Sequence, residues 1–333
     1  MTELGGLFPI GPRQVHRVGY GAMQLSGDGV FGPPRDRNEA LRVLRAAVEA
    51  GVDHIDTAQF YGAGSVNQLI RAALSPYPDN LAIVSKVGSV RGLRPGKLRR
   101  GIEENLAALG VNRLAAVNFR LMDPAAVPGK TFDAGLAELV KARDEGLIEG
   151  VGLSNVSRRH LLRAVEQTEI VCVQNLFNLA ERDSLDVLTE CATRDIAFVP
   201  FCPLGLPGDQ RRGLLTDPLL AKHADRLGTT PAQLALTWLL DLAPNVLLIP
   251  GTRSTTHLTE NLGVADVHLD QSTQDELTHS SGRLKTGSAM CRWLGGVSDL
   301  QPGRPRRCTR HRSRMRRQRV ARWWQGGSCG SPR

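Results

Sequence analysis

Short apolar segments alternate with longer amphipathic segments through most of this chain, and this alternation limits the folds that it can adopt. The short segments are rich in apolar and β-branched residues, which is typical of strands, and the stretches between them have helical periodicity. Eight segments are predicted as strands: 18–21, 53–56, 81–86, 114–120, 148–154, 170–174, 196–202 and 246–249. Most of them are apolar at nearly every position, which indicates a parallel sheet covered by helices.

Helices are predicted between these strands, so that strand and helix alternate strictly over about 250 residues. The predicted helices begin near Asn38, Val66, Pro95, Thr131, Ser157, Glu181 and Thr230, with a last pair after His257. This pattern predicts a (β/α)8 TIM barrel. A doubly wound sheet is the alternative, but Gly19-Tyr20-Gly21 lacks the third glycine of a dinucleotide-binding turn. Gly11-Pro12, between apolar positions, predicts a short N-terminal hairpin that closes the bottom of the barrel.

Charge divides the chain near residue 282. The 333 residues include 42 Lys and Arg and 33 Asp and Glu, which gives a net charge of +9. Of these, 14 basic residues and one acidic residue follow Gly282, and 28 basic and 32 acidic residues precede it, so the first part carries −4 and the second +13. Beyond Gly282 no regular periodicity continues, and arginine blocks occur at 304–307 and 310–322. We therefore expect a barrel domain over 1–282 and a basic, disordered tail over 283–333, either a genuine tail or the product of a shifted reading frame.

The composition also limits the partners. A slightly acidic body excludes a nucleic-acid footprint over the whole surface and leaves the tail as the place for such a contact. No apolar run is long enough to span a membrane, and the first residues lack a signal-peptide pattern. The six cysteines have neither a CxxC pattern nor a paired zinc-ligand spacing, which predicts free thiols and no metal site. These observations predict a cytoplasmic protein and leave its oligomeric state open.

Polar side chains gather where the predicted strands end, and this is the edge at which (β/α)8 barrels carry their chemistry. Asp56, Tyr61 and Lys86 belong to two such ends. Tyrosine is a weak acid at neutral pH, and a neighbouring lysine lowers its pKa by stabilising the phenolate. A buried lysine in turn needs a counter-charge, which Asp56 can supply. The three residues predict a proton donor for a carbonyl oxygen; the alternative is a plain Asp56–Lys86 ion pair beside a loop aromatic.

Five segments, in order along the predicted strands, resemble motifs of the aldo-keto reductase family. Residues 54–62 (HIDTAQFYG) are similar to its DTAxxYG motif, and residues 84–87 (VSKV) resemble its lysine strand. Residues 152–155 (GLSN) are similar to its GxSN motif, and residues 200–205 (PFCPLG) resemble its YSPLG segment. Residues 249–261, which run from Ile-Pro-Gly-Thr to Glu-Asn, resemble its last cofactor motif.

The resemblance implies a fold, an activity and a set of site residues. It implies NAD(P)H-dependent reduction of small aldehydes or ketones to alcohols on a (β/α)8 barrel, with Tyr61 as general acid and with Lys86 and Asp56 tuning it. The cofactor contacts that it implies are the backbone of Gly21, Ala22 and Met23, the carboxamide ligands Ser154, Asn155 and Gln174, the stacking ring of Phe201, and the further contacts Cys202, Pro203, Leu204, Gly251, Thr252, Arg253, His257, Glu260 and Asn261.

The chain departs from the family pattern at the fourth catalytic position, where Arg120 stands in place of histidine. Asn118 lies two residues earlier on the same strand face, and we expect it to contact the substrate. Arginine cannot relay a proton, because its pKa is above 12. It can instead donate hydrogen bonds to a developing oxyanion or to an anionic substrate group. The alternative is that Arg120 turns aside into an ion pair and merely widens the pocket.

The chain also departs from the family pattern at the residues that would contact the adenosine end of the cofactor. Gly251 and His257 stand where the family often has lysine and arginine, so a preference for NADP over NAD rests on Thr252 and Arg253, with His257 beside them. Arg253 as an ordinary solvated side chain is the alternative. The helix near His257 can also present its N-terminus to a phosphate. Cys202 replaces a serine, and we interpret it as an inert buried thiol rather than a redox switch.

Two features narrow the resemblance to one branch of the family. Asn118-x-Arg120 and the Ile-Pro-Gly-Thr segment with His257 resemble a bacterial pyridoxal-reductase-like branch, which makes pyridoxal the first substrate to consider. An NADP(H)-binding regulatory or sensor protein with little turnover is the second interpretation, because the family's histidine is absent. Nucleic-acid binding through residues 310–322 is the third.

Overall fold

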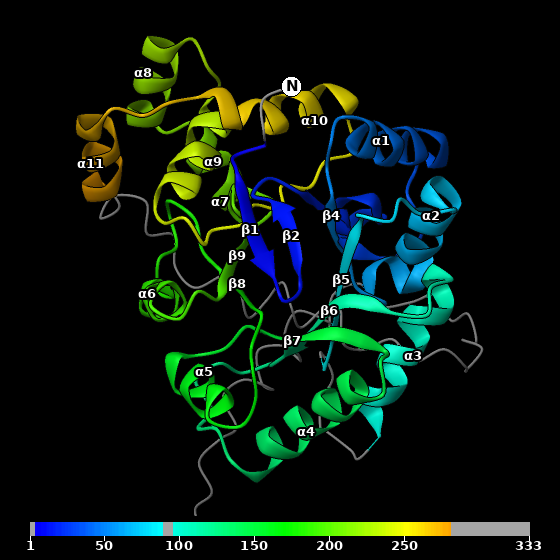
Figure 1. The fold of residues 1–333 in the computed structure, drawn as a ribbon. Coiled ribbons are helices and arrows are strands. Elements are labelled where there is room, and N and C mark those ends of the chain that lie inside the picture. Colours follow the sequence, from blue (N-terminus) through cyan, green and yellow to red (C-terminus); the bar gives the residue numbers. More distant parts are fainter. Residues whose placement is uncertain (1–3, 89–95, 281–333) are drawn as a thin grey trace, which may run out of the picture. The chain divides into compact units, whose positions relative to one another are not determined.

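The computed structural model describes residues 4–88 and 96–280. The predicted tail over 283–333 and its boundary near 282 lie outside these residues and stay predictions. Seven strands form one parallel sheet in sequence order (Figure 1). They are β3 (Tyr20–Gly21), β4 (His54–Asp56), β5 (Ala82–Val87), β6 (Leu114–Arg120), β7 (Ile148–Ser154), β8 (Cys172–Leu176) and β9 (Ala197–Phe201).

The eighth predicted segment closes the sheet into a barrel by single bridges rather than as a continuous strand. Val246 bridges Phe198 of β9, and Leu248 bridges Val18, just before β3; both bridges are parallel. The Leu247 amide donates to the Phe198 carbonyl at 2.9 Å, and the Gly19 amide donates to the Leu248 carbonyl at 2.9 Å. Because this segment joins the last strand to the first, the predicted (β/α)8 barrel is confirmed and the doubly wound sheet is wrong.

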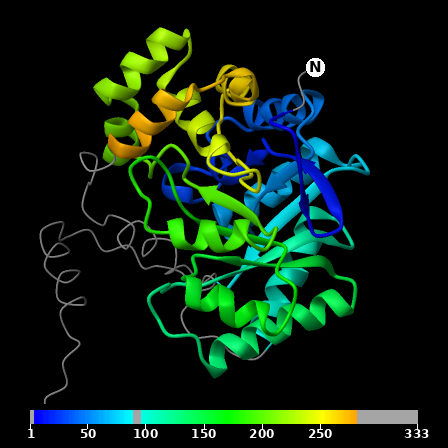
Figure 2. The ribbon, with the colours of Figure 1, turned by 60° about the vertical axis from the view of Figure 1, so that its left-hand side comes forward.

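Helices follow the strands and lie on their outer side in both views (Figures 1 and 2). The eight that complete the β/α units are α1 (Arg37–Glu49), α2 (Ser65–Leu74), α3 (Lys97–Leu109), α4 (Lys130–Asp144), α5 (Arg158–Val165), α6 (Leu185–Ala192), α9 (Pro231–Asp241) and α10 (Thr255–Leu262). The additional helices are α7 (Asp209–Leu215), α8 (Pro218–Leu227) and α11 (Gln271–His279), with 3-10 turns η1 (Ala22–Leu25), η2 (Asp28–Val30), η3 (Tyr61–Gly64) and η4 (Gly263–Asp266). No helix in the described part of the chain is long and apolar enough to cross a membrane.

The predicted N-terminal hairpin is confirmed as β1 (Leu7–Ile10) and β2 (Arg13–His16), which pair antiparallel across Gly11-Pro12. Ile10 and Val15 are buried among residues of the barrel interior. The Asp53 carboxylate, just before β4, accepts hydrogen bonds from the His16 amide at 3.0 Å and from His16 Nδ1 at 2.7 Å. The hairpin therefore closes the N-terminal end of the barrel.

Polarity changes along the inside of the barrel. Near the hairpin the interior holds small apolar side chains, among them Ala82, Val84 and Ala116. Two residues further along the same strands, with their side chains on the same face, the interior becomes charged at Lys86 and, after Asn118, at Arg120. The sequence pattern of β5 and β6 thus places the charged groups at the carboxyl ends of the strands.

Candidate active site

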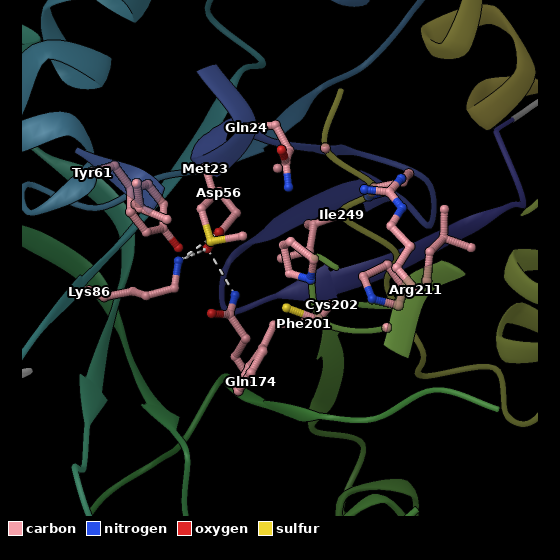
Figure 3. Close-up of a pocket in the computed structure, with 18 of the residues that line it drawn as sticks. Met23, Gln24, Asp56, Tyr61, Lys86, Gln174, Phe201, Cys202, Arg211 and Ile249 are labelled. Atoms are coloured by element: carbon pink, nitrogen blue, oxygen red, sulfur yellow. Dashed lines mark hydrogen bonds and ion pairs between the residues drawn. The ribbon is translucent and has the colours of Figure 1, made fainter. Parts of the chain in front are cut away.

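A cavity lies at the carboxyl ends of the barrel strands (Figure 3). Residues from the strand ends and from the loops that follow them form its wall. They are Gly21, Met23, Gln24, Val30, Asp56, Phe60, Tyr61, Lys86, Arg120, Gln174, Phe201, Cys202, Pro203, Leu204, Gly205, Pro207, Arg211, Ile249, Pro250 and Gly251. All four predicted catalytic residues are among them, and so are eight of the predicted cofactor contacts.

A buried ion pair forms the floor of the catalytic corner. Lys86 Nζ lies 2.7 and 2.6 Å from the two carboxylate oxygens of Asp56 and donates to the Thr57 carbonyl at 3.1 Å. Burial lowers the pKa of Lys86, but the negative charge and the hydrogen bonds of Asp56 outweigh it, so the pKa of Lys86 is above its ordinary value. Gln174 Nε2 also donates to Asp56, at 2.9 Å. Lys86 is therefore a fixed ammonium group at neutral pH.

Tyr61 lies against this ammonium group. Lys86 Nζ is 5.0 Å from the centre of the Tyr61 ring, and the phenol oxygen points toward it in Figure 3. The ring of Phe60 packs edge-on against Tyr61, with centroids 5.1 Å apart. Burial raises the pKa of Tyr61 and the charge of Lys86 opposes it, but the pKa remains above its ordinary value. Tyr61 is thus a protonated phenol beside a cation, which is the arrangement of a proton donor.

A buried polar network lies behind the Tyr61 loop, outside the cavity. Asn67 of α2 accepts a hydrogen bond from Thr57 Oγ1 at 2.7 Å and donates to Gln59 at 2.8 Å and to Asn105 of α3 at 2.9 Å. Ser85 Oγ, next to Lys86, donates to the same Asn105 oxygen at 2.6 Å. The network joins the segment before Tyr61 to the strand that carries Lys86. We did not predict it, although an asparagine on the buried face of a helix is an available signal.

Arg120, the last residue of β6, is 6% exposed and faces the cavity. Its Nη1 donates a long hydrogen bond to Ser154 Oγ at 3.4 Å, and its Cζ is 5.3 Å from the centre of the Phe201 ring. Its Nε has no hydrogen-bond partner within the described residues. Burial lowers the pKa of Arg120 below its ordinary value. Among residues 4–88 and 96–280 no carboxylate pairs with it, so the alternative of an ion pair finds no support.

Three predicted contacts lie behind the cavity wall. Asn118 is fully buried beneath the site, where its Oδ1 accepts a hydrogen bond from Cys172 Sγ at 3.3 Å. A side chain at Gly152 would place its Cβ 2.1 Å from this oxygen, so the glycine makes room for Asn118. Asn118 does not line the cavity, and its contact with the substrate stays a prediction. Ser154 and Asn155 are also buried and do not line the cavity, since Asn155 Nδ2 donates to the Leu121 carbonyl at 2.8 Å.

Gly21 and Gly251 meet where β3 ends and the eighth segment has just ended. A Cβ on Gly251 would be 2.5 Å from the Gly21 carbonyl oxygen, and a Cβ on Gly21 would be 2.4 Å from the Ile249 carbonyl oxygen. Such distances are too short for any side chain. The contact therefore gives a physical reason for a glycine at position 251, where the family often has lysine.

The opposite wall is formed by Phe201, Cys202, Pro203 and Leu204 after β9. Burial raises the pKa of Cys202 to about 12, which keeps its thiol protonated. Arg211, at the start of α7, also lines this wall, and burial lowers its pKa. Arg211, Gln24, Val30 and Phe60 are lining residues that we did not predict, because they belong to loops and short helices without a strand-end signal.

The remaining predicted cofactor contacts do not line the cavity. Ala22, the first residue of η1, is buried. Thr252 is buried, and its carbonyl accepts a hydrogen bond from the Tyr20 hydroxyl at 2.6 Å. Arg253 and His257 are exposed beside the N-terminus of α10, which is capped by Ser254, and Glu260 and Asn261 lie at the other end of that helix. Within the described residues, no cluster of His, Cys, Asp and Glu is suited to a metal ion.

Comparisons with known proteins agree on one family. The model of the Aldo/keto reductase family matches residues 17–281. The chain is 44% identical over 274 residues to pyridoxine 4-dehydrogenase of Escherichia coli K12, which covers 79% of this chain and 94% of the relative. It is 35% identical to the uncharacterized oxidoreductase C215.11c of Schizosaccharomyces pombe, over 79% and 86% of the two chains.

Solved structures give the same result. A thermostable aldo-keto reductase crystallised with the inhibitor epalrestat superposes with a TM-score of 0.72 at 29% identity, over 82% of this chain and 99% of the other. An aldo/keto reductase from Klebsiella pneumoniae in complex with NADP and acetate gives 0.68 at 25% identity, over 80% and 92%. The chain is an oxidoreductase that belongs to the aldo/keto reductase family.

Proposed function

We propose that this protein reduces small aldehydes or ketones to alcohols with NADPH, and that Tyr61 is its general acid. The observation that carries the proposal is the buried Asp56–Lys86 pair directly beside the protonated phenol of Tyr61 at the cavity wall. Carbonyl reduction needs a proton at the oxygen as negative charge develops there. Bound NADPH would supply the hydride to the carbonyl carbon, and Tyr61 would protonate the oxygen.

The residues of the cavity fit a nicotinamide cofactor. Gln174 Oε1 is buried and has no hydrogen-bond partner within the described residues, so it is free to accept from the cofactor's carboxamide. The Phe201 ring offers a flat face to the nicotinamide. The close backbone approach at Gly21 and Gly251 leaves a wall without side chains. Exposed Arg253 and His257 at the N-terminus of α10 suit the adenosine phosphate, which favours NADP over NAD.

Arg120 stands where the family has histidine, and its role there would be to bind negative charge rather than to relay a proton. It would donate hydrogen bonds to the carbonyl oxygen as charge develops there, without releasing a proton. Pyridoxal is the first substrate to examine, because the Escherichia coli relative is a pyridoxine 4-dehydrogenase. We expect the enzyme to act in the cytoplasm, where its thiols stay reduced, and any nucleic-acid contact to involve residues 310–322 alone.

The first experiment is NADPH oxidation by the purified protein with pyridoxal and 4-nitrobenzaldehyde. We expect turnover with the wild type and a loss of at least about a hundredfold in Tyr61→Phe, since general-acid catalysis contributes that much. Fluorescence titration should show that Tyr61→Phe still binds NADPH. Tight binding without turnover in the wild type would contradict the proposal and favour a regulatory cofactor-binding protein.

A further inference from the structure

The charges of the cavity wall do not balance. Its described lining residues include three cations, Lys86, Arg120 and Arg211, but one carboxylate, Asp56. Lys86 is neutralised by Asp56 at 2.6 Å. Arg120 and Arg211 form no ion pair with any described residue. The wall therefore presents two standing positive charges to whatever the cavity holds.

Arg120 is the less compensated of the two at the catalytic corner. Only 6% of it is exposed, and its Nε has no hydrogen-bond partner within the described residues. Its Nη1 donates a long hydrogen bond to a neutral hydroxyl, Ser154 Oγ, at 3.4 Å. A guanidinium group carries five N–H donors in a planar fork. A buried charge with unused donors costs free energy, and a ligand with a matching negative charge recovers it.

The position of Arg120 limits where that negative charge can lie on a ligand. Arg120 and Tyr61 line the same cavity at the ends of the strands, and the guanidinium group lies 5.3 Å from the centre of the Phe201 ring. The guanidinium group and the acid that would protonate the carbonyl therefore serve the same corner of the cavity. A planar fork binds two neighbouring oxygens at once better than it binds one.

We propose that the preferred substrates are aldehydes that carry an ionised oxygen on the carbon atom adjacent to the attachment point of the aldehyde group. Arg120 binds this ionised oxygen. The inference rests on the proposed reductase function and specifies its substrate class: ortho-phenolate aldehydes, in which the two oxygens lie side by side. Pyridoxal, with a hydroxyl next to its aldehyde, has this chemistry. The proton still comes from Tyr61 and a C–H bond still forms at the carbonyl carbon, so Arg120 exchanges no proton.

The test compares 2-hydroxybenzaldehyde with 2-methoxybenzaldehyde, which cannot ionise, and with 4-hydroxybenzaldehyde, whose charge is remote. We expect the wild type to prefer the 2-hydroxy compound in kcat/KM, and Arg120→Met to lose about tenfold or more of that preference, as for a charged hydrogen bond. For each protein, the preference is the ratio of kcat/KM for the 2-hydroxy compound to kcat/KM for a control aldehyde. Dividing the ratio of the wild type by the ratio of the variant cancels the intrinsic reactivities of the aldehydes. Arg120→Lys should keep part of the preference.

Arg211→Met is the matched control, because it also removes an unpaired arginine from the cavity wall. The preference should survive in this variant; if both variants lose it equally, the total charge matters and the position of Arg120 does not. A uniform loss with all three aldehydes in Arg120→Met would mean that Arg120 serves the developing oxyanion alone, and it would overturn the inference. No Tyr61-dependent turnover of any aldehyde would instead refute the reductase function itself.

A binding measurement gives an independent readout. The phenolate of 2-hydroxybenzaldehyde absorbs at a longer wavelength than the phenol, and oxidised NADP permits binding without reduction. Binding to the wild type should lower the apparent pKa of the ligand's phenol, because Arg120 stabilises the anion. Binding to Arg120→Met should not lower it. An unshifted phenol in the wild type would also refute the inference, and circular dichroism of each variant checks that it is folded.

Discussion

At the scale of single residues, the site is a chain of charges that ends at one phenol. Asp56 fixes the charge of Lys86, and Lys86 in turn faces Tyr61. Burial raises the pKa of the Tyr61 phenol, while the positive charge of Lys86 stabilises the phenolate that forms when the proton is transferred. With the pKa above its ordinary value, Tyr61 stays a protonated phenol across the physiological range, as its proposed role as general acid requires.

This balance sets the pH dependence of the reaction. Reduction needs the protonated phenol, and burial raises the pKa of Tyr61, so kcat/KM for 4-nitrobenzaldehyde should stay flat from weakly acidic to weakly alkaline pH and fall only in strong alkali. Oxidation of the corresponding alcohol needs the phenolate and should rise over the same range. Both pH profiles are measured by the change in NADPH absorbance. An inflection near neutral pH in the reduction profile would contradict the assignment of Tyr61 as the general acid.

The cavity residues at strand ends or within the recognised motifs were predicted from the sequence, and several in the loops and short helices beyond them were missed. Asp56, Lys86 and Arg120 could be located because parallel strands bring their carboxyl ends to one edge. Gln24 and Arg211 could not, because their positions depend on how η1 and α7 fold over the barrel. Asn118 shares a strand face with Arg120, but strand periodicity gives the direction of a side chain and not its depth below the cavity.

At the scale of elements, the turn that carries Tyr61 is held from behind. Asn67 of α2 contacts Thr57, Gln59 and Asn105, and thereby joins the loop after β4 to α2 and α3. Thr57, Asn67 and Asn105 are buried, so water does not compete for the hydrogen bonds between them. The element that positions the acid is therefore a polar network rather than apolar packing alone.

Asn67→Leu should both destabilise the protein and slow it. It leaves the buried Thr57 hydroxyl without its acceptor and the half-buried Gln59 without its donor, which should lower the free energy of unfolding by about 1–3 kcal/mol. It should also lower kcat more than it raises KM, because Tyr61 is held less firmly. Urea unfolding and steady-state kinetics measure the two effects. Gln68→Leu, an exposed neighbour on the same helix, is the matched control, and equal effects in both variants would exclude a role for the network.

The order of the strands and helices could be predicted from the sequence, but the existence or the start of some helices could not. Six of the seven predicted helix starts that carry a residue number lie within two residues of the observed ones, because caps and apolar periodicity agree, as at Thr230 with Pro231. The helix expected near Glu181 begins at Leu185, since residues 178–181 instead form a backbone bridge. Helices α7 and α8 were missed: α7 buries one residue, Leu214, and therefore shows no apolar stripe.

At the scale of the whole molecule, the barrel has one closed end and one working end. The hairpin β1–β2 fills the N-terminal end, and the cavity occupies the other. The hairpin is fixed by the Asp53 carboxylate, which accepts hydrogen bonds from His16. Folding and chemistry thus depend on separate sets of residues in the same strands, and a change at the closed end should alter stability before it alters catalysis.

Asp53→Asn tests this separation through pH. Burial alone would raise the pKa of Asp53, but the neighbouring His54 ring and the hydrogen bond from the His16 amide lower it below the ordinary value. A carboxyl group whose pKa is lower in the folded state contributes stability above its unfolded pKa of about 3.9 and loses that contribution as the pH falls below it. Urea unfolding should therefore show a loss of about 1–3 kcal/mol for Asp53→Asn at pH 7 and a smaller loss in acid.

The control for this prediction is Asp209→Asn, because its carboxylate is almost fully exposed. That variant should unfold like the wild type at both pH values. A loss for Asp53→Asn that stays constant as the pH falls would contradict the role of the carboxylate charge. A loss of kcat that exceeds the loss of folded protein would contradict the separation of the two ends.

The contact between Gly21 and Gly251 also constrains how this enzyme can evolve. Any single substitution at either position drives a side chain into the backbone of the other strand end, so the lysine of related sequences is not one mutational step away. It would require a prior shift of the main chain, which makes its effect depend on the genetic background. Variation in nucleotide preference within this lineage should therefore accumulate at Arg253 and His257, where exposed positions tolerate exchange, and directed evolution of cofactor use is best begun there.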